Sequence, residues 1–169
     1  SWDESDSTAL RQLDTLFTKQ EEWLDLLQIL ERLRGLVAPE EGQDLLVRIG
    51  QLWESELDST SDAISSYAKL LEDDPTDERG VTALEAIVVQ KDEREDAFQV
   101  LVPVLEVSES WERLFNLHEV LVSLREDPAE KVQLFNRMGE LAETHLSNPN
   151  QAFMCYSRAL EQSPRDMEI

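Results

Sequence analysis

The stretch YAKLLEDDPTD (residues 67–77) returns in altered form 89 positions later as YSRALEQSPRD (residues 156–166). The tyrosine, a Leu-Glu pair, the proline and the final aspartate keep their register in both copies. Agreement of this kind at a fixed distance is typical of a chain built from stacked, similar units. The sequence therefore predicts an internal repeat, and the fold follows from what one unit looks like.

Matched positions extend well beyond this stretch. The repeat signature consists of four residues in each copy, all displaced by 89: Gly50, Ala63, Tyr67 and Pro75, with Gly139, Ala152, Tyr156 and Pro164. Upstream, Ala9 and Trp23 match Ala97 and Trp111 at a displacement of 88. We predict one domain over residues 1–169, with a first unit at about 9–96 and most of a second at 97–169. Because the chain begins without methionine, we expect it to be a piece of a longer protein.

Apolar residues recur with the period of a helix in each unit. Leu45, Ile49 and Leu52 lie on one face of a 3.6-residue period, and no segment alternates as a strand does. Proline follows a capping residue at Asp127-Pro128 and at Asn148-Pro149, the usual start of a helix. Helices are expected near residues 7–19, 21–36, 40–57, 60–73, 77–90, 93–107, 109–125, 128–146 and 149–163.

Short connections between these helices favour antiparallel neighbours, and a helix with one apolar stripe must bury it against them. We therefore predict an all-α fold, a right-handed α-solenoid of antiparallel helix hairpins with about nine helices. Pro103 falls inside the sixth predicted helix, where it removes a hydrogen bond and favours a bend.

Charge narrows the classes of partner. The 37 acidic residues outnumber the 15 basic ones, which gives a formal net charge of −22. Such a field repels phosphate backbones and anionic lipid headgroups, so neither a nucleic acid nor a membrane is an expected partner. The chain has no apolar run of about 20 residues and no signal-like start, which favours a cytoplasmic location.

The sequence contains few residues that could form a catalytic or metal-binding site. His118 and His145 belong to no metal-binding motif, and each is more typical of a structural histidine. Cys155 lies on a predicted helix with no histidine to activate it, so a buried or edge thiol is expected. The acidic run that begins at Asp58 lacks the glycine and the final glutamate of a calcium loop. We predict no catalytic residue, no cofactor and no metal.

The segments LLVRIGQLWESELDSTSDAISSYAKLLEDDP (residues 45–75) and LFNRMGELAETHLSNPNQAFMCYSRALEQSP (residues 134–164) resemble tetratricopeptide repeats. Gly50 and Gly139 match the small position of that family's first helix, where two helices approach closely. Tyr67 and Tyr156 match the aromatic position of its second helix. The whole unit is similar to long helical repeat arrays of bacterial proteins, for which the resemblance implies no activity.

In tetratricopeptide stacks the first helix of each pair lines a groove that binds peptides. The resemblance implies eight partner-binding positions here: Asp44, Val47, Gln51, Glu54, Gln133, Asn136, Glu140 and Glu143. Family members that hold a terminal carboxylate use basic residues and asparagine at such positions, whereas acidic side chains are frequent here. We therefore expect a basic or mixed-charge peptide or protein as partner. The alternative is that these residues only face solvent.

Two functions remain open at this point. The first is a non-catalytic scaffold for protein–protein interaction. The second is a regulatory or substrate-docking segment of a larger multidomain enzyme. Self-association is a further expectation, because the repeat ends on an apolar edge near Tyr156 and Leu160.

Overall fold

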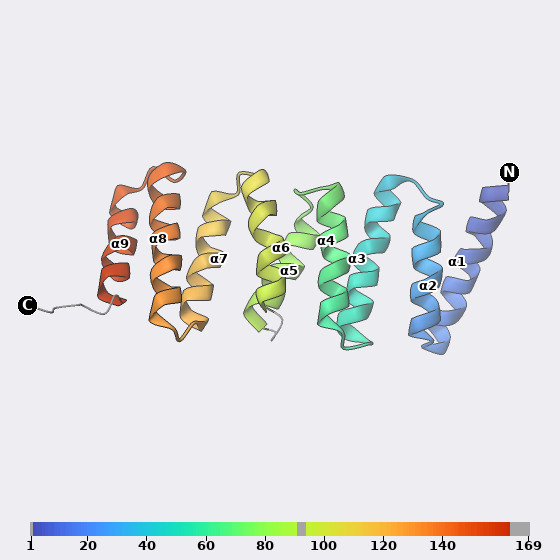
Figure 1. Cartoon of the computed structure of the whole chain (residues 1–169). Helices are drawn as coiled ribbons and strands as arrows, with labels where there is room; N and C mark the ends of the chain where they lie inside the picture. The colour runs from blue at the N-terminus through green and yellow to red at the C-terminus, as the bar shows by residue number, and fades with distance from the viewer. Residues whose placement is uncertain (1, 91–93, 163–169) are drawn as a thin grey trace, which may run out of the picture. The chain divides into compact units, whose positions relative to one another are not determined.

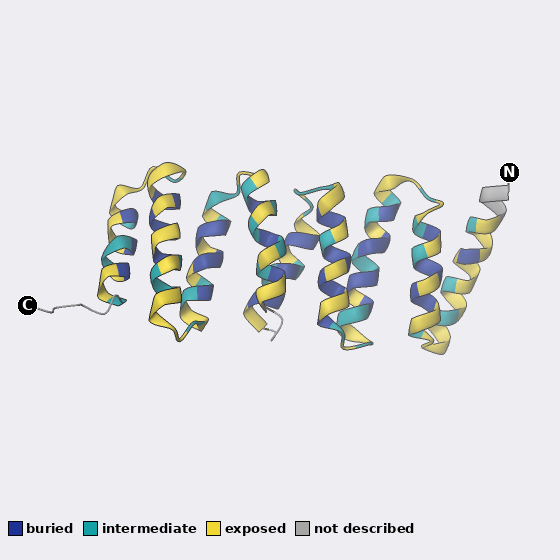
Figure 2. Ribbon diagram, in the orientation of Figure 1, coloured by how far each residue is buried: buried dark blue, intermediate teal, exposed yellow. Residues whose placement is uncertain are grey.

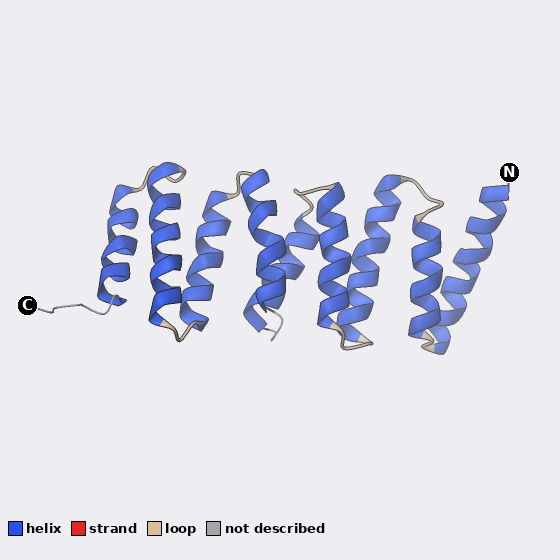
Figure 3. Ribbon diagram, in the orientation of Figure 1, coloured by secondary structure: helices blue, strands red, loops and turns tan. Residues whose placement is uncertain are grey.

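The computed structural model describes residues 2–90 and 94–162, and within these ranges it contains nine α-helices and no strand (Figures 1 and 3). The helices are α1 (Trp2–Gln20), α2 (Trp23–Arg34), α3 (Pro39–Ser55), α4 (Thr60–Asp73), α5 (Glu78–Gln90), α6 (Arg94–Val107), α7 (Trp111–Leu124), α8 (Pro128–Thr144) and α9 (Pro149–Gln162). The all-α prediction is confirmed, and each predicted segment corresponds to one helix in the same order. The first helix begins at Trp2, earlier than the predicted residue 7.

Two of the predicted helix starts carry the expected side-chain caps. At α8, Asp127 Oδ1 accepts a hydrogen bond from the Ala129 N–H at 3.0 Å. At α9, Asn148 Oδ1 accepts one from the Gln151 N–H at 3.1 Å. A proline follows each cap at the first helical position, where its missing N–H leaves no hydrogen bond unmade. These caps fix where the last two helices begin.

The turns between helices repeat as the sequence does. Asp58 and Ser147, 89 positions apart, both take the left-handed conformation with φ of 49°. In both turns an N–H reaches back to the end of the preceding helix: Ser59 donates to Trp53 O and Asn148 to Ala142 O, each at 2.8 Å. Since a left-handed residue stops a helix and reverses the chain, this turn places α4 against α3 and α9 against α8 in the same way.

Contacts between Cα atoms divide the chain into two compact units, Ser1–Leu101 and Val102–Ile169. In unit 1 each helix from α1 to α5 packs against the next, and in unit 2 α7 packs on α8 and α8 on α9. Buried residues form a stripe along the helices (Figure 2). The unit 1 core includes Leu26, Leu30, Leu33, Leu45 and Ile49.

A glycine marks the crossing between the two helices of each repeated pair. A Cβ atom added to Gly50 of α3 would lie no more than 3.0 Å from three atoms of the Tyr67 ring on α4. A Cβ added to Gly139 of α8 would lie equally close to the Tyr156 ring on α9. Only a residue without a side chain lets the ring pack directly on the helix backbone. The expectation that both glycines lie where helices approach closely is confirmed.

The other signature residues differ in where they lie. Ala63 and Ala152 are buried, at 0% and 4% exposure, and Pro75 lies in the connection between α4 and α5. Pro164 lies outside the described residues, as do residues 91–93, which link α5 to α6. Pro103 lies inside α6, as predicted. None of the described helices combines the length and the apolar composition needed to cross a bilayer.

Replacing Gly50 by alanine tests this crossing against a control in the same helix. The new methyl group would overlap the Tyr67 ring, so we expect Gly50→Ala to lower the free energy of unfolding by roughly 1–3 kcal/mol. Gly42, also in α3, has no neighbour closer than 3.5 Å to an added Cβ. Gly42→Ala should instead leave stability unchanged or raise it by up to about 1 kcal/mol, because alanine favours helix. Urea unfolding measures both, and equal effects would refute the crossing.

Candidate functional site

The eight predicted partner-binding residues lie on α3 and α8, and none of them is buried. On α3, Asp44 and Gln51 are exposed, and Val47 and Glu54 are half-buried. On α8 all four are exposed: Gln133, Asn136, Glu140 and Glu143. The spacing of each set places its members on one side of its helix, away from the buried stripe. We call these two sets the acidic faces of α3 and α8.

Two glutamates of these faces also hold the helix crossings. The Tyr67 hydroxyl donates a hydrogen bond to Glu54 Oε2 at 2.8 Å, and the Tyr156 hydroxyl donates one to Glu143 Oε2 at 3.3 Å. The glycine, the tyrosine and the glutamate therefore form one repeated arrangement, in which the ring lies on the glycine and its hydroxyl reaches the face. Sequence reasoning assigned Glu54 and Glu143 to partner binding and missed their bond to tyrosine.

The same arrangement perturbs the tyrosines. Burial raises the pKa of the Tyr67 phenol far above its usual range, and the hydrogen bond to Glu54 and its negative charge add to this effect. The pKa of Tyr156 is raised by the same causes, burial first and the charge of Glu143 next. Both tyrosines therefore stay neutral donors at physiological pH, and each helps to orient its glutamate.

The other acidic members of the faces have cationic neighbours. Asp44 forms an ion pair with Arg79 of α5, and Glu140 lies 3.3 Å from Arg137 on its own helix. Arg79 also binds Asp77, and this hydrogen bond lowers the pKa of Asp77, whose carboxylate accepts the Arg79 N–H at the start of α5. Side chains of Asp44 and Glu140 remain 68% and 58% exposed, so both carboxylates stay open to solvent.

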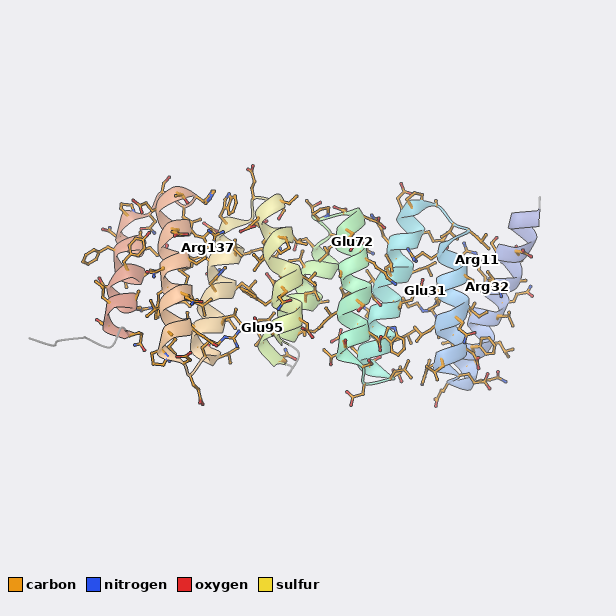
Figure 4. All side chains as sticks on the ribbon, viewed as in Figure 1. Arg11, Glu31, Arg32, Glu72, Glu95 and Arg137 are labelled. Carbon is orange, nitrogen blue, oxygen red and sulfur yellow. The ribbon has the colours of Figure 1, made fainter. Side chains whose placement is uncertain are left out.

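Two arginines beside the acidic faces were missed by sequence reasoning. Arg48 of α3 donates hydrogen bonds to both carboxylate oxygens of Asp14 on α1, at 2.7 and 2.6 Å. Arg137 of α8, labelled in Figure 4, donates one to Glu106 of α6 at 2.7 Å. In each unit the arginine joins helices that are next but one along the chain. Arg48 and Arg137 are 89 positions apart, so the displacement of the repeat could have identified them as an equivalent pair.

A pocket lies beside α3 in unit 1 and another beside α8 in unit 2, each on the side of the helix that faces away from its acidic face. In unit 1 it has a volume of about 580 Å³ and is lined by Leu27 and Glu31 of α2 and by Ile49 of α3, among others. In unit 2 a pocket of about 380 Å³ is lined by the matching residues Phe115, Glu119 and Met138, together with residues of α9.

A cation accompanies each pocket. Lys69 of α4 lies 3.8 Å from Glu31, and Arg158 of α9, its repeat equivalent, lines the pocket with Glu119. Glu31 can be followed in Figure 4. The sequence reading assigned binding only to the faces of α3 and α8, so it did not anticipate these pockets.

The two histidines and the cysteine have structural surroundings. His118 is buried, its Nδ1 lies 2.7 Å from the Leu114 carbonyl oxygen, and burial lowers the pKa of the imidazole. His145 stacks on Trp111 with ring centroids 3.7 Å apart. Cys155 is 3% exposed, and burial raises the pKa of its thiol, the reverse of what an activated nucleophile needs. Among the described residues, no group of three or more His, Cys, Asp or Glu could hold a metal ion.

Titration of the two tyrosines tests the repeated arrangement. Because the folded state keeps the Tyr67 proton while the unfolded state loses it near pH 10, stability should fall as the pH rises above about 10. Tyr67→Phe should remove most of that slope and lower the free energy of unfolding at pH 7 by about 1–2 kcal/mol. Tyr156→Phe, with its longer bond, is the control and should cost less. Two phenolate absorbance midpoints near pH 10 in the folded chain would contradict the assignment.

Alkylation of the single cysteine tests its burial. In the folded chain at pH 8, iodoacetamide should modify Cys155 at least about tenfold more slowly than in urea, because the thiol is buried and its pKa is raised. Mass spectrometry measures the rate of modification at a single site, since the chain has one cysteine. Modification at the same rate with and without urea would show that the thiol is accessible.

Comparison with known proteins adds no assignment to this geometry. No model of a protein family matches the chain, and no curated protein matches it. The resemblance to tetratricopeptide repeats therefore stays a prediction, and the case for any function rests on the residues and contacts described above.

Proposed function

We propose that the chain is a non-catalytic scaffold for protein–protein interaction, a right-handed α-solenoid of the tetratricopeptide type. Each acidic face, on α3 in unit 1 and on α8 in unit 2, binds a basic or mixed-charge peptide or protein. The observation that carries the proposal is that one arrangement is built two times: in each unit a glycine–tyrosine crossing holds a glutamate, Glu54 or Glu143, at equivalent positions of α3 and α8.

Ion pairs between alternate helices support a stack of hairpins. In unit 1, Arg48 joins α3 to α1 and Arg79 joins α5 to α3, while Lys69 joins α4 to α2. In unit 2, Arg137 joins α8 to α6. Odd-numbered helices of unit 1 thus have side chains in reach of each other, and so do its even-numbered helices. Two-layered packing of this kind is what consecutive antiparallel hairpins produce.

The charges on and around the acidic faces support the proposal of a basic partner. The three arginines near the acidic faces, Arg48, Arg79 and Arg137, are each bound to carboxylates of the chain. Exposed ion pairs of this kind contribute only about 0–1 kcal/mol, so a partner's arginine or lysine can compete for Asp44 or Glu140 at little cost. With a formal net charge of −22, the chain as a whole attracts a basic partner over a longer range.

Charge reversal on α8 tests the proposal. Peptides selected from a random display library on the immobilised chain serve as probes, and calorimetry measures their affinity at two salt concentrations. We expect enrichment of Lys and Arg among the peptides, and Glu140→Lys should weaken binding about 3–10-fold at low salt and flatten its salt dependence.

Glu161→Lys is the matched control. Glu161 is exposed on α9, and its reversal changes the net charge by the same amount. It should weaken binding much less, because it lies off the acidic face. Equal losses in the two variants would mean that only net charge matters, and an unchanged affinity in Glu140→Lys would refute the proposed face.

A further inference from the structure

The pocket of unit 1, which we call the α2–α3 pocket, has a mostly apolar lining that solvent reaches. Its volume of about 580 Å³ falls within the range of roughly 300–1,000 Å³ in which small ligands bind. Leu24, Leu27, Ile49 and Trp53 supply apolar surface to it. Leu24 is 62% exposed and Trp53 is half-buried, so part of this surface is open. Small-ligand sites typically combine such a lining with a few polar groups that fix the orientation of the ligand.

Helices of unit 1 flank this pocket on both sides. The pocket lies between α2 and α3, and α1 packs against α2 while α4 packs against α3. Lys69 of α4 also lies 3.8 Å from Glu31, which lines the pocket. The open lining is therefore a feature of the packed unit and does not belong to a terminal helix.

Arg32 of α2 brings a positive charge that no group of the chain neutralises. It lines the pocket and is exposed, and it is labelled on α2 in Figure 4. Among the side chains that the structure describes, none forms a hydrogen bond, ion pair or ring contact with Arg32. Arg48, Arg79 and Arg137, by contrast, are bound to carboxylates. With 37 acidic and 15 basic residues in the chain, an arginine without a carboxylate partner is the exception.

The carboxylate that lines the pocket is already compensated. Glu31 Oε2 accepts a hydrogen bond from Arg34 Nε at 3.2 Å, and Glu31 Oε1 lies 3.8 Å from Lys69 Nζ. Two cations thus share one anion, and Arg32 adds a further positive charge. The charged groups that line the pocket or bind its lining are therefore positive in sum, although the formal net charge of the chain is −22.

The repeat shows that helix packing does not require this arginine. The pocket of unit 2 keeps a glutamate, Glu119, where unit 1 has its own. Val120 and Ala142, however, occupy the positions that match Arg32 and Trp53. Because unit 2 packs its helices in the same order without the arginine and the tryptophan, these two residues distinguish the α2–α3 pocket from its counterpart.

We propose that the α2–α3 pocket binds a small monocarboxylic acid with an apolar body. The body contacts Leu24 and Trp53, and the carboxylate accepts paired hydrogen bonds from the Arg32 guanidinium. A single negative charge suits the unbound arginine, whereas a ligand with several would meet the repulsion of the whole acidic chain. This site goes beyond the proposed scaffold function and lies on the side of α3 away from its acidic face.

A set of matched probes tests the proposal by nuclear magnetic resonance of the isotope-labelled chain. Trp53→Phe identifies the indole N–H signal of Trp53. We expect 4-phenylbutyrate to shift this signal and amides of α2 with a dissociation constant of about 1 mM, as suits so small a ligand. 4-Phenylbutanol, which has the same body without the charge, should bind about 3–10-fold more weakly. Butyrate, which has the charge without the ring, should also bind more weakly.

Two arginine variants separate the pocket from net charge. Arg32→Gln should weaken the binding of 4-phenylbutyrate about 3–10-fold and leave that of 4-phenylbutanol unchanged. Arg11→Gln is the matched control, because Arg11 of α1 is also exposed but does not line the pocket. It should change either affinity by less than about twofold, since an exposed charge outside the pocket acts only weakly. Both variants alter exposed side chains, so both should fold.

Several outcomes would overturn the proposal. They are the absence of a Trp53 shift with 4-phenylbutyrate, equal affinity for the acid and the alcohol, and equal losses in Arg32→Gln and Arg11→Gln. Tighter binding of 4-phenylbutylamine would assign the pocket to cations through Glu31 and would also overturn it. Glu140→Lys should bind 4-phenylbutyrate as the parent chain does, so the result is independent of the acidic faces.

Discussion

The contact between a glycine and a tyrosine ring is the constraint on which the paired helices depend. At Gly50 and at Gly139 there is no room for even one methyl group beside the ring. A ring seated on bare backbone fixes both the distance and the rotation of one helix against the other, because packed interiors leave few alternatives. The ring's hydroxyl then reaches Glu54 or Glu143, so the same contact orders the surface above it.

The sequence was sufficient to predict the features that depend on residues close together along the chain. Helix ends follow from caps and periodicity, and Asp127 and Asn148 cap their helices as expected. The paired glycines and tyrosines stood out because they recur in register. The interhelical ion pairs could not be predicted in this way, since the bond from Arg48 to Asp14 joins residues 34 positions apart and depends on how each helix is rotated.

The same limit applied to the candidate site. The resemblance alone suggested the residues of the acidic faces, and Glu54 and Asp44 among them have partners within the chain that no pattern revealed. The pocket beside Ile49 is lined by two helices and the pocket beside Met138 by three, so their positions depend on tertiary packing.

A double-mutant cycle on Gly50 and Tyr67 tests the central contact most directly. If the ring is what forbids a side chain at position 50, Gly50→Ala should be destabilising beside Tyr67 but neutral or slightly stabilising in a Tyr67→Leu background, where alanine's helix preference is no longer opposed. Urea unfolding of the four proteins gives the coupling free energy. A cost of Gly50→Ala that is the same in both backgrounds would show that the two residues act independently and would contradict the account.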